Sequence, residues 1–227
     1  MKFEFHTFTL PNGLRVIHKE VPRSASHVAL VVNAGSRDEL PGEEGVAHFI
    51  EHCLFKGTKK RKTFHVLNRL ERVGGDLNAY TTKEETWISA SFLERDLARA
   101  IELVSDISFN STFPEKEIAK EQEVILDEIA SVLDNPSDVI FDEFEDRLFG
   151  SHPLGRTILG TQESVNNLGK LQINSFVDRY YCPDQMVFAS VGSTPISKLK
   201  KLCEKYLSHE IGRVSKLNRL VPRIPFG

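Results

Sequence analysis

The sequence predicts an α+β fold in which a mainly antiparallel, twisted sheet packs against several helices. Residues 3–21 alternate apolar and polar side chains on either side of a turn at residues 11–13, which is the pattern of a β-hairpin. Residues 27–33 form a nearly continuous apolar run, which is typical of a strand in the middle of a sheet. From residue 95 onward, apolar side chains recur every three or four positions and indicate amphipathic helices.

A helix is expected directly after the central strand. It begins near Gly45 and ends before Gly57, where a left-handed cap residue is expected. Val46, Phe49 and Phe55 would form the apolar face that anchors this helix in the core.

The next segment predicts a short helix and two strands. Thr63 is expected to cap a helix that reaches about residue 73 and is closed by Gly74 and Gly75. Two strand-like runs then flank a polar centre at residues 82–84.

The second half is predicted to be mainly helical. Pro114 suits the first turn of a long helix that carries Glu121 and Glu128, and Thr194 is expected to cap a helix that starts with Pro195. The predicted elements are helices at 95–109, from 114 to a stop at 135–136, at 137–149 and at 171–180, a strand at 186–191 and a helix at 195–206. Helix 137–149 has apolar Val139, Ile140, Phe144 and Leu148, and we interpret its acidic residues, Asp142, Glu143, Glu145 and Asp146, as a solvated face.

Length and charge limit the classes of protein that fit. A chain of 227 residues suits one large domain, which we place at residues 1–207, followed by a linker at 208–227 that has two late prolines and no clear period. The net charge is −3 with acids and bases interspersed, so we expect no nucleic-acid partner and no anionic membrane surface.

The cysteines and the amino terminus predict a cytoplasmic protein. Cys53, Cys182 and Cys203 have no CxxC spacing, and their odd number fits a reducing compartment. The first residues contain no apolar signal core, and no run in the chain approaches about 18 apolar residues.

The chemistry is concentrated in the stretch HFIEH. Each helical residue advances by about 100°, so His48, Glu51 and His52 present two imidazoles and a carboxylate to one side of the helix. Neutral imidazole is a preferred zinc ligand, and a neighbouring Glu can take a proton from water, so this helix would supply two metal ligands and a base. A hydrolytic zinc site needs a third protein ligand from elsewhere.

A second pair of acids lies on the long helix that follows Pro114. Glu121 and Glu128 are seven residues apart and share a face, and Ile125 lies beside that face, where burial is expected. Carboxylates on a partly buried face usually have a partner, which makes this helix a source for the missing ligand.

HFIEH followed by Glu128 resembles the inverted zinc motif of the pitrilysin, or inverzincin, family of metallopeptidases. The resemblance extends to AGSRDE at 34–39, FKGT at 55–58, GGDLNAYTTKEET at 74–86, VILDEI at 124–129 and HPLGRTILGT at 152–161, and it is closest to the processing-peptidase and bacterial branches.

The resemblance implies a processing-peptidase-like metallohydrolase domain with one Zn²⁺ per chain. It makes His48, His52 and Glu128 the zinc ligands, Glu51 the general base, and Glu121 a residue that supports the site without binding the ion. It also implies that residues 77–80 form an edge strand along which an extended peptide or unfolded protein binds. We expect Asn78, Ala79 and Tyr80 to contact that substrate, although Asn78 is also a common residue at strand ends without any ligand.

Two isolated features are given structural roles. Cys53 points about 140° away from His48 on the helix and is not expected to bind the metal. His152 has no partner at ligand spacing, and His6, His18, His27, His65 and His209 are isolated in the same way.

Members of this family use a second, similar domain to complete the peptide-binding chamber, so the resemblance implies a second pitrilysin-like domain or a partner subunit. Without it, weak or no peptidase activity is expected. The alternative function is a non-catalytic pitrilysin-like scaffold or binding subunit, although scaffolds of this kind typically lack an intact zinc motif.

Overall fold

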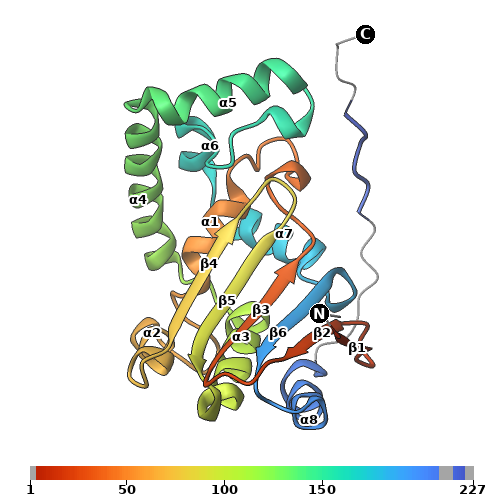
Figure 1. The fold of residues 1–227 in the computed structure, drawn as a ribbon. Coiled ribbons are helices and arrows are strands. Elements are labelled where there is room, and N and C mark those ends of the chain that lie inside the picture. Colours follow the sequence, from red (N-terminus) through yellow and green to blue (C-terminus); the bar gives the residue numbers. More distant parts are fainter. Residues whose placement is uncertain (1–3, 210–216, 223–227) are drawn as a thin grey trace.

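The computed structural model describes residues 4–209 and 217–222 of the chain. Its strands are β1 (His6–Thr9), β2 (Arg15–Glu20), β3 (Ala25–Val32), β4 (Asp76–Thr81), β5 (Thr86–Leu93) and β6 (Met186–Gly192). They form one sheet in the order β1-β2-β6-β3-β5-β4 (Figure 1). All neighbouring strands are antiparallel except β2 and β6, so the predicted mainly antiparallel sheet is confirmed.

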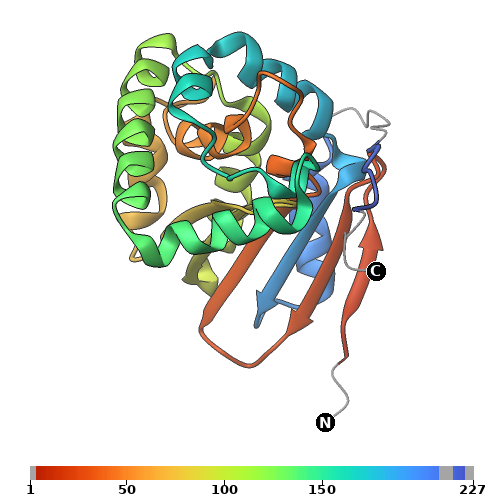
Figure 2. The ribbon, with the colours of Figure 1, turned by 90° about the horizontal axis from the view of Figure 1, so that it is seen from above.

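Helices make up most of the remainder. They are α1 (Val46–Leu54), α2 (Thr63–Glu71), α3 (Leu97–Asn110), α4 (Glu115–Leu133), α5 (Pro136–Phe149), α6 (Gln162–Asn167), α7 (Lys170–Tyr180) and α8 (Ile196–Leu207). Seen from above, the helices gather mainly on one side of the sheet (Figure 2). No helix in the described ranges is long and apolar enough to cross a membrane.

The core lies between the sheet and these helices. Along β5, Ile88, Ala90 and Phe92 are buried, whereas the alternate residues Trp87 and Ser89 remain partly exposed. This alternation is expected of a strand that packs one face against helices. β3 lies between β6 and β5, so its prediction as a central strand is confirmed.

Two predicted helix caps in the first half are wrong. α2 begins at Thr63 itself, and its N-cap is Lys62. The Thr63 hydroxyl does not cap the helix, because it donates to the carbonyl of Lys56 at 2.9 Å. α1 already ends at Leu54, with Phe55 in a right-handed conformation. Gly57 lies beyond the helix at φ +136° and forms a β-bridge with Lys62, so its positive φ serves the following turn.

Two prolines also stand one position away from their predicted places. Pro114 and Pro195 are the N-caps of α4 and α8, not residues inside the first turn, and Thr194 therefore does not cap α8. Both prolines have extended backbone, which is the conformation of an N-cap residue.

Helix α5 is confirmed, but no residue on it is buried. Ile140 is 57% exposed and Phe144 is 60% exposed. α5 contacts α4 and the short turn Pro153–Gly155, and Figure 1 shows it crossing beyond the end of the sheet. It therefore presents apolar side chains outward.

The predicted linker at 208–227 lies partly outside the described residues, at 210–216 and 223–227. Its described part, residues 217–222, lies against the domain. Arg219 donates from Nε and Nη2 to the two carboxylate oxygens of Asp38 at 2.9 and 2.8 Å, and from Nη1 to Oδ1 of Asn33 at 3.1 Å. A forked contact of this kind fixes both position and orientation.

Candidate metal centre

The start of α1 is held by a buried carboxylate. Glu39 is 4% exposed, and its two oxygens accept hydrogen bonds from the backbone amides of Gly45 and Ala47, each at 3.0 Å. These amides belong to the helix N-terminus, where backbone donors without a partner in the helix favour a hydrogen-bond acceptor. Glu39 therefore fixes the helix that carries the HFIEH motif.

A loop interlocks with the same helix start. Gly45 has φ +92°, and a Cβ there would lie 2.5 Å from the carbonyl oxygen of Leu159. Gly160 has φ +77°, and a Cβ there would lie 2.5 Å from the carbonyl oxygen of Glu44. Glycine is needed at both positions because of the close approach and the left-handed backbone. The stretch HPLGRTILGT thus supports α1 from outside.

Helix α4 brings the distant acids to α1. Ile125 is fully buried, which confirms the burial expected beside the Glu121 and Glu128 face, and Ile118 and Ile129 are buried on the same helix. α4 contacts α1 directly.

His48, His52 and Glu128 meet at one point. The Glu128 Oε2 atom lies 3.6 Å from Nε2 of His48 and 3.6 Å from Nε2 of His52. One ligand atom from each of the three residues lies within 4.8 Å of the others. Within the described residues, these three form the one group of His, Cys, Asp or Glu side chains that could hold a metal ion.

The donor set fits zinc. Two ligands bound tetrahedrally at zinc–ligand distances near 2.0–2.1 Å lie about 3.3 Å apart, which is close to the 3.6 Å separations between Glu128 and the two imidazoles. Two imidazoles and a carboxylate are also the ligand types of catalytic zinc sites that keep one position open.

Burial tunes the protonation of two site residues. Burial, together with the neighbouring His52, lowers the pKa of His48 to about 4, so at neutral pH its imidazole is uncharged and has a free lone pair. Burial also raises the pKa of Glu51, while hydrogen bonding by Thr81 acts in the opposite direction. A raised pKa brings a carboxyl group closer to the range of a useful proton acceptor and donor.

Glu121 supports His52 from behind. Its Oε2 lies 3.2 Å from Nδ1 of His52, and its Oε1 lies 2.7 Å from Nζ of Lys56. An acceptor at Nδ1 places the proton there and leaves Nε2 free to face Glu128.

An open cleft of about 380 Å³ adjoins the three residues. His48, Glu51 and Glu128 line it together with Tyr80 and Thr81 from the end of β4. Its other lining residues come from α4, α5 and the loop after α5, namely Val132, Asp138, Phe141, Asp142, Thr157, Ile158 and Leu159. Asp142, which we interpreted as part of a solvated face, thus also borders the cleft.

β4 is the edge strand of the sheet, as expected, because it pairs with β5 alone. Of the three expected substrate contacts, Asn78 and Tyr80 are exposed, whereas the Ala79 side chain is buried. Oδ1 of Asn78 accepts from the backbone amide of Ala79 at 2.9 Å. Tyr80 stacks on Trp87 and borders the cleft.

Among the described residues, those given structural roles are not members of the three-residue group. Cys53 is buried, and burial raises the pKa of its thiol to about 12. His152 accepts from the amide of Leu154 at 3.2 Å and caps the short turn after it. Sequence reasoning missed Glu39, Thr81 and the cleft residues of α5; an acid shortly before a helix start was the available signal for Glu39.

Comparison with known proteins decides the family. The model of the family described as "Insulinase (Peptidase family M16)" matches residues 15–162. The chain belongs to the M16, or insulinase, family of peptidases. The match to this family model confirms the resemblance predicted from the sequence. The fold is shared with pitrilysin, whose structure has a TM-score of 0.89 at 21% identity and covers 99% of this chain and 25% of its own.

M16 relatives include proteins named as zinc proteases. An uncharacterized zinc protease of Mycobacterium leprae is 41% identical over 207 residues, which cover 90% of this chain and 46% of that protein. The mitochondrial-processing peptidase subunit beta of Saccharomyces cerevisiae is 35% identical over 204 residues, covering 89% and 44%. The periplasmic protease PqqL of Escherichia coli has a TM-score of 0.89 at 28% identity, covering 96% and 25%.

The chain therefore spans about half the length of the curated relatives it matches. Its family is a peptidase family, and the relatives it matches include a zinc protease and a processing-peptidase subunit. The fold by itself does not establish catalysis, since a peptidase M16 inactive domain from Pseudomonas fluorescens has a TM-score of 0.90 at 20% identity.

Proposed function

We propose that this chain is the zinc-binding half of an M16 endopeptidase that hydrolyses extended peptides. The observation that carries the proposal is the convergence of Glu128 with His48 and His52, because a carboxylate 3.6 Å from both imidazoles makes a three-ligand zinc site with Glu51 beside it. His48, His52 and Glu128 would hold one Zn²⁺ per chain, and zinc would supply Lewis acidity to water and to the peptide carbonyl.

The remaining chemistry belongs to the side chains. Glu51 borders the same cleft as His48 and Glu128 and acts as the general base that accepts a proton from the attacking water. The same carboxyl group then returns the proton to the leaving amine. Glu121 acts as a positioning residue, because its contact with Nδ1 of His52 fixes the orientation of that imidazole.

Peptide binding is assigned to the open edge of β4. Backbone groups on an edge strand can pair with an extended peptide and give affinity with little demand on its sequence. Tyr80 and Thr81 lie at the end of β4 that borders the cleft, so a peptide added to this edge would reach Glu51. Asn78 and Tyr80 offer side chains to it, whereas the buried Ala79 offers only its backbone.

A second M16-like domain or subunit is needed to complete this enzyme. The matched relatives are about twice as long as this chain. α5 leaves Ile140, Phe141 and Phe144 exposed, and Phe141 also lines the cleft, so a second domain could cover this face. The alternative is a non-catalytic scaffold or binding subunit, which would need no metal. A cytoplasmic location stays a prediction.

Metal content separates the two functions. We expect purified chain to contain about one zinc ion, measured by inductively coupled plasma mass spectrometry after removal of loosely bound metal. His48→Ala should lose the ion because a ligand is gone, and Glu51→Gln should retain it because Glu51 is not a ligand. A chain that binds no zinc near neutral pH would favour the scaffold.

A further inference from the structure

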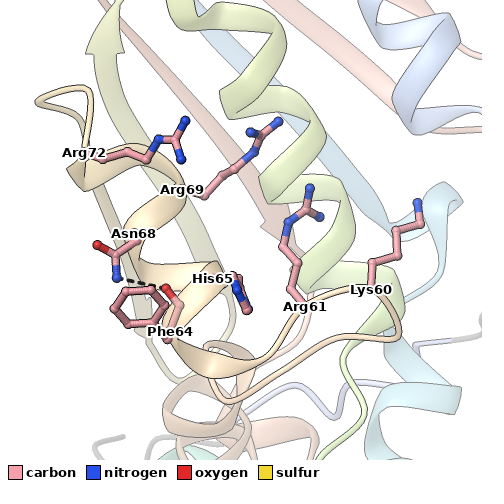
Figure 3. A pocket seen from close by; sticks show the side chains of 7 residues that line it. All are labelled: Lys60, Arg61, Phe64, His65, Asn68, Arg69 and Arg72. Carbon is pink, nitrogen blue, oxygen red and sulfur yellow. Dashed lines mark hydrogen bonds between the residues drawn. The ribbon is translucent and has the colours of Figure 1, made fainter.

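A second hollow lies on α2 and the loop before it, and it is rich in cations (Figure 3). It encloses about 340 Å³. Its lining includes His65 and four cationic side chains, Lys60, Arg61, Arg69 and Arg72, and none of its lining residues is acidic. This concentration of positive charge is local, because the chain as a whole has a net charge of −3.

Ion pairs with acidic residues neutralise only part of this positive charge. Arg61 pairs with Glu102 at 2.7 Å and also with Asp106, and Arg69 approaches Glu102 at 3.5 Å. Within the described residues, neither Lys60 nor Arg72 forms an ion pair. Figure 3 shows these two residues at opposite ends of the hollow, so each could bind an anionic group without displacing an existing partner.

The same hollow has an apolar wall. The Phe64 ring is 69% exposed, which is unusual for a phenylalanine. Phe64, Asn68 and Arg72 follow one another at intervals of four and so lie along one side of the helix, as Figure 3 shows. A ligand that combines carboxylates with apolar atoms matches this surface better than a simple ion does.

The position of α2 relates the hollow to the metal centre. Arg72 precedes Asp76, the first residue of β4, by four positions. α2 and α1 both contact β4, and Figure 1 shows them beside its opposite ends. Six residues of strand span about 20 Å. A peptide on the open edge of β4 could thus reach the metal centre at one end and α2 at the other.

We propose that the α2 hollow is an exosite, a binding site outside the catalytic centre, for acidic side chains of the polypeptide substrate several residues from the cleaved bond. This rests on the proposed peptidase function. A polypeptide is favoured over a nucleic acid because the unpaired cations, Lys60 and Arg72, are few and share the hollow with an exposed Phe64, whereas nucleic acids require an extended basic stripe.

The test is peptide binding to the purified chain, followed by fluorescence anisotropy. The probes are labelled peptides of about twelve residues, which span about 40 Å when fully extended. One has a run of glutamates at its amino end, a second has the run at its carboxyl end, and each has a counterpart with glutamines at the same positions. Of the two glutamate peptides, we expect the one that binds more tightly to bind about five- to tenfold more tightly at low salt than the peptide with glutamines at the same positions. This difference in affinity should shrink as the salt concentration rises.

Charge-reversal variants locate the effect. Lys60→Glu with Arg72→Glu should abolish the preference for glutamate, and the neutral pair Lys60→Gln with Arg72→Gln should remove most of it. The matched control, Arg15→Glu with Lys201→Glu, changes the net charge equally at exposed residues of β2 and α8 and should keep the preference. Zinc content should be unchanged in every variant, so a failure of the exosite is distinguishable from a failure of the peptidase proposal.

Three results would overturn the proposal. The first is equal affinity for the glutamate and glutamine peptides. The second is a preference that persists in both the Glu and the Gln variants at positions 60 and 72. The third is tighter binding of an RNA oligonucleotide than of the glutamate peptide at equal salt, with that RNA binding lost in the same variants. This result would assign the hollow to nucleic acid.

Discussion

At the scale of single residues, Glu39 is a buried acid that holds the start of α1. Burial raises its pKa to about 8, although the amides of Ala47 and Gly45 and the charge of Arg156 act in the opposite direction. The folded protein therefore binds this proton more tightly than the unfolded chain, in which the pKa has its ordinary value of 4.5.

The first prediction concerns stability against pH. Because the folded-state pKa is raised, the contribution of Glu39 to folding is most favourable below pH 4.5, falls as the pH rises, and is constant again above about 8. Glu39→Gln should remove this dependence, which amounts to at most about 1.4 kcal/mol per pH unit in that window.

The measurement is chemical denaturation of the metal-free chain at several pH values between about 4.5 and 8. Glu123→Gln, a substitution at an exposed acid on α4, is the control and should leave the slope unchanged. Equal pH slopes in wild type and Glu39→Gln would show that Glu39 is not the group that titrates.

Among the site residues, those within one helix were the most predictable from sequence. His48, Glu51 and His52 follow from helical spacing alone. Glu128 required the family resemblance as well, because spacing cannot say which distant carboxylate reaches two imidazoles. Glu39 escaped prediction because it caps α1 from a loop six residues before Gly45 and not from the N-cap position.

At the scale of elements, α1 depends on its fit against the loop at residues 157–160. The second prediction compares two glycines that precede α1. Gly42 has φ +87° and open space within 4 Å of the point that a Cβ would occupy, whereas a Cβ at Gly45 would meet the backbone of Leu159. Gly42→Ala should cost about 1–2 kcal/mol from backbone strain, and Gly45→Ala about 2–5 kcal/mol from strain plus overlap.

Both variants are compared with wild type by urea denaturation, and their zinc affinity is measured by competition with a chelator. Gly45→Ala should also weaken zinc binding, because α1 must shift to relieve the overlap, while Gly42→Ala should leave it nearly intact. Equal losses of stability in the two variants would indicate that the contact with Leu159 does not hold α1.

The strands and longer helices were predictable because their periodic patterns span many residues. The ends of helices were less so: the Thr63 hydroxyl binds Lys56, and Pro195, not Thr194, precedes α8. α6, from Gln162 to Asn167, has only six residues, too few for a period to show. Strand β6 lies between β2 and β3, and such a crossover leaves no local signal in sequence.

At the scale of the whole molecule, the third prediction is that this chain alone cleaves peptides weakly or not at all. Substrate would be held at the β4 edge from one side only, so much of the positioning that catalysis requires would be missing. The measurement is cleavage of an unstructured, quenched fluorescent peptide by the zinc-loaded chain, with Glu51→Gln as the blank. Robust cleavage that is absent in Glu51→Gln would show that no second domain is required.

The position of bound zinc tests the central claim most directly. A crystal of the chain grown with zinc, measured at the zinc absorption edge, should show one anomalous peak within about 2.0–2.2 Å of Nε2 of His48, Nε2 of His52 and a carboxylate oxygen of Glu128. A peak bound elsewhere, or a Glu128 carboxylate that stays out of reach of a zinc ion on the two imidazoles, would contradict the assignment.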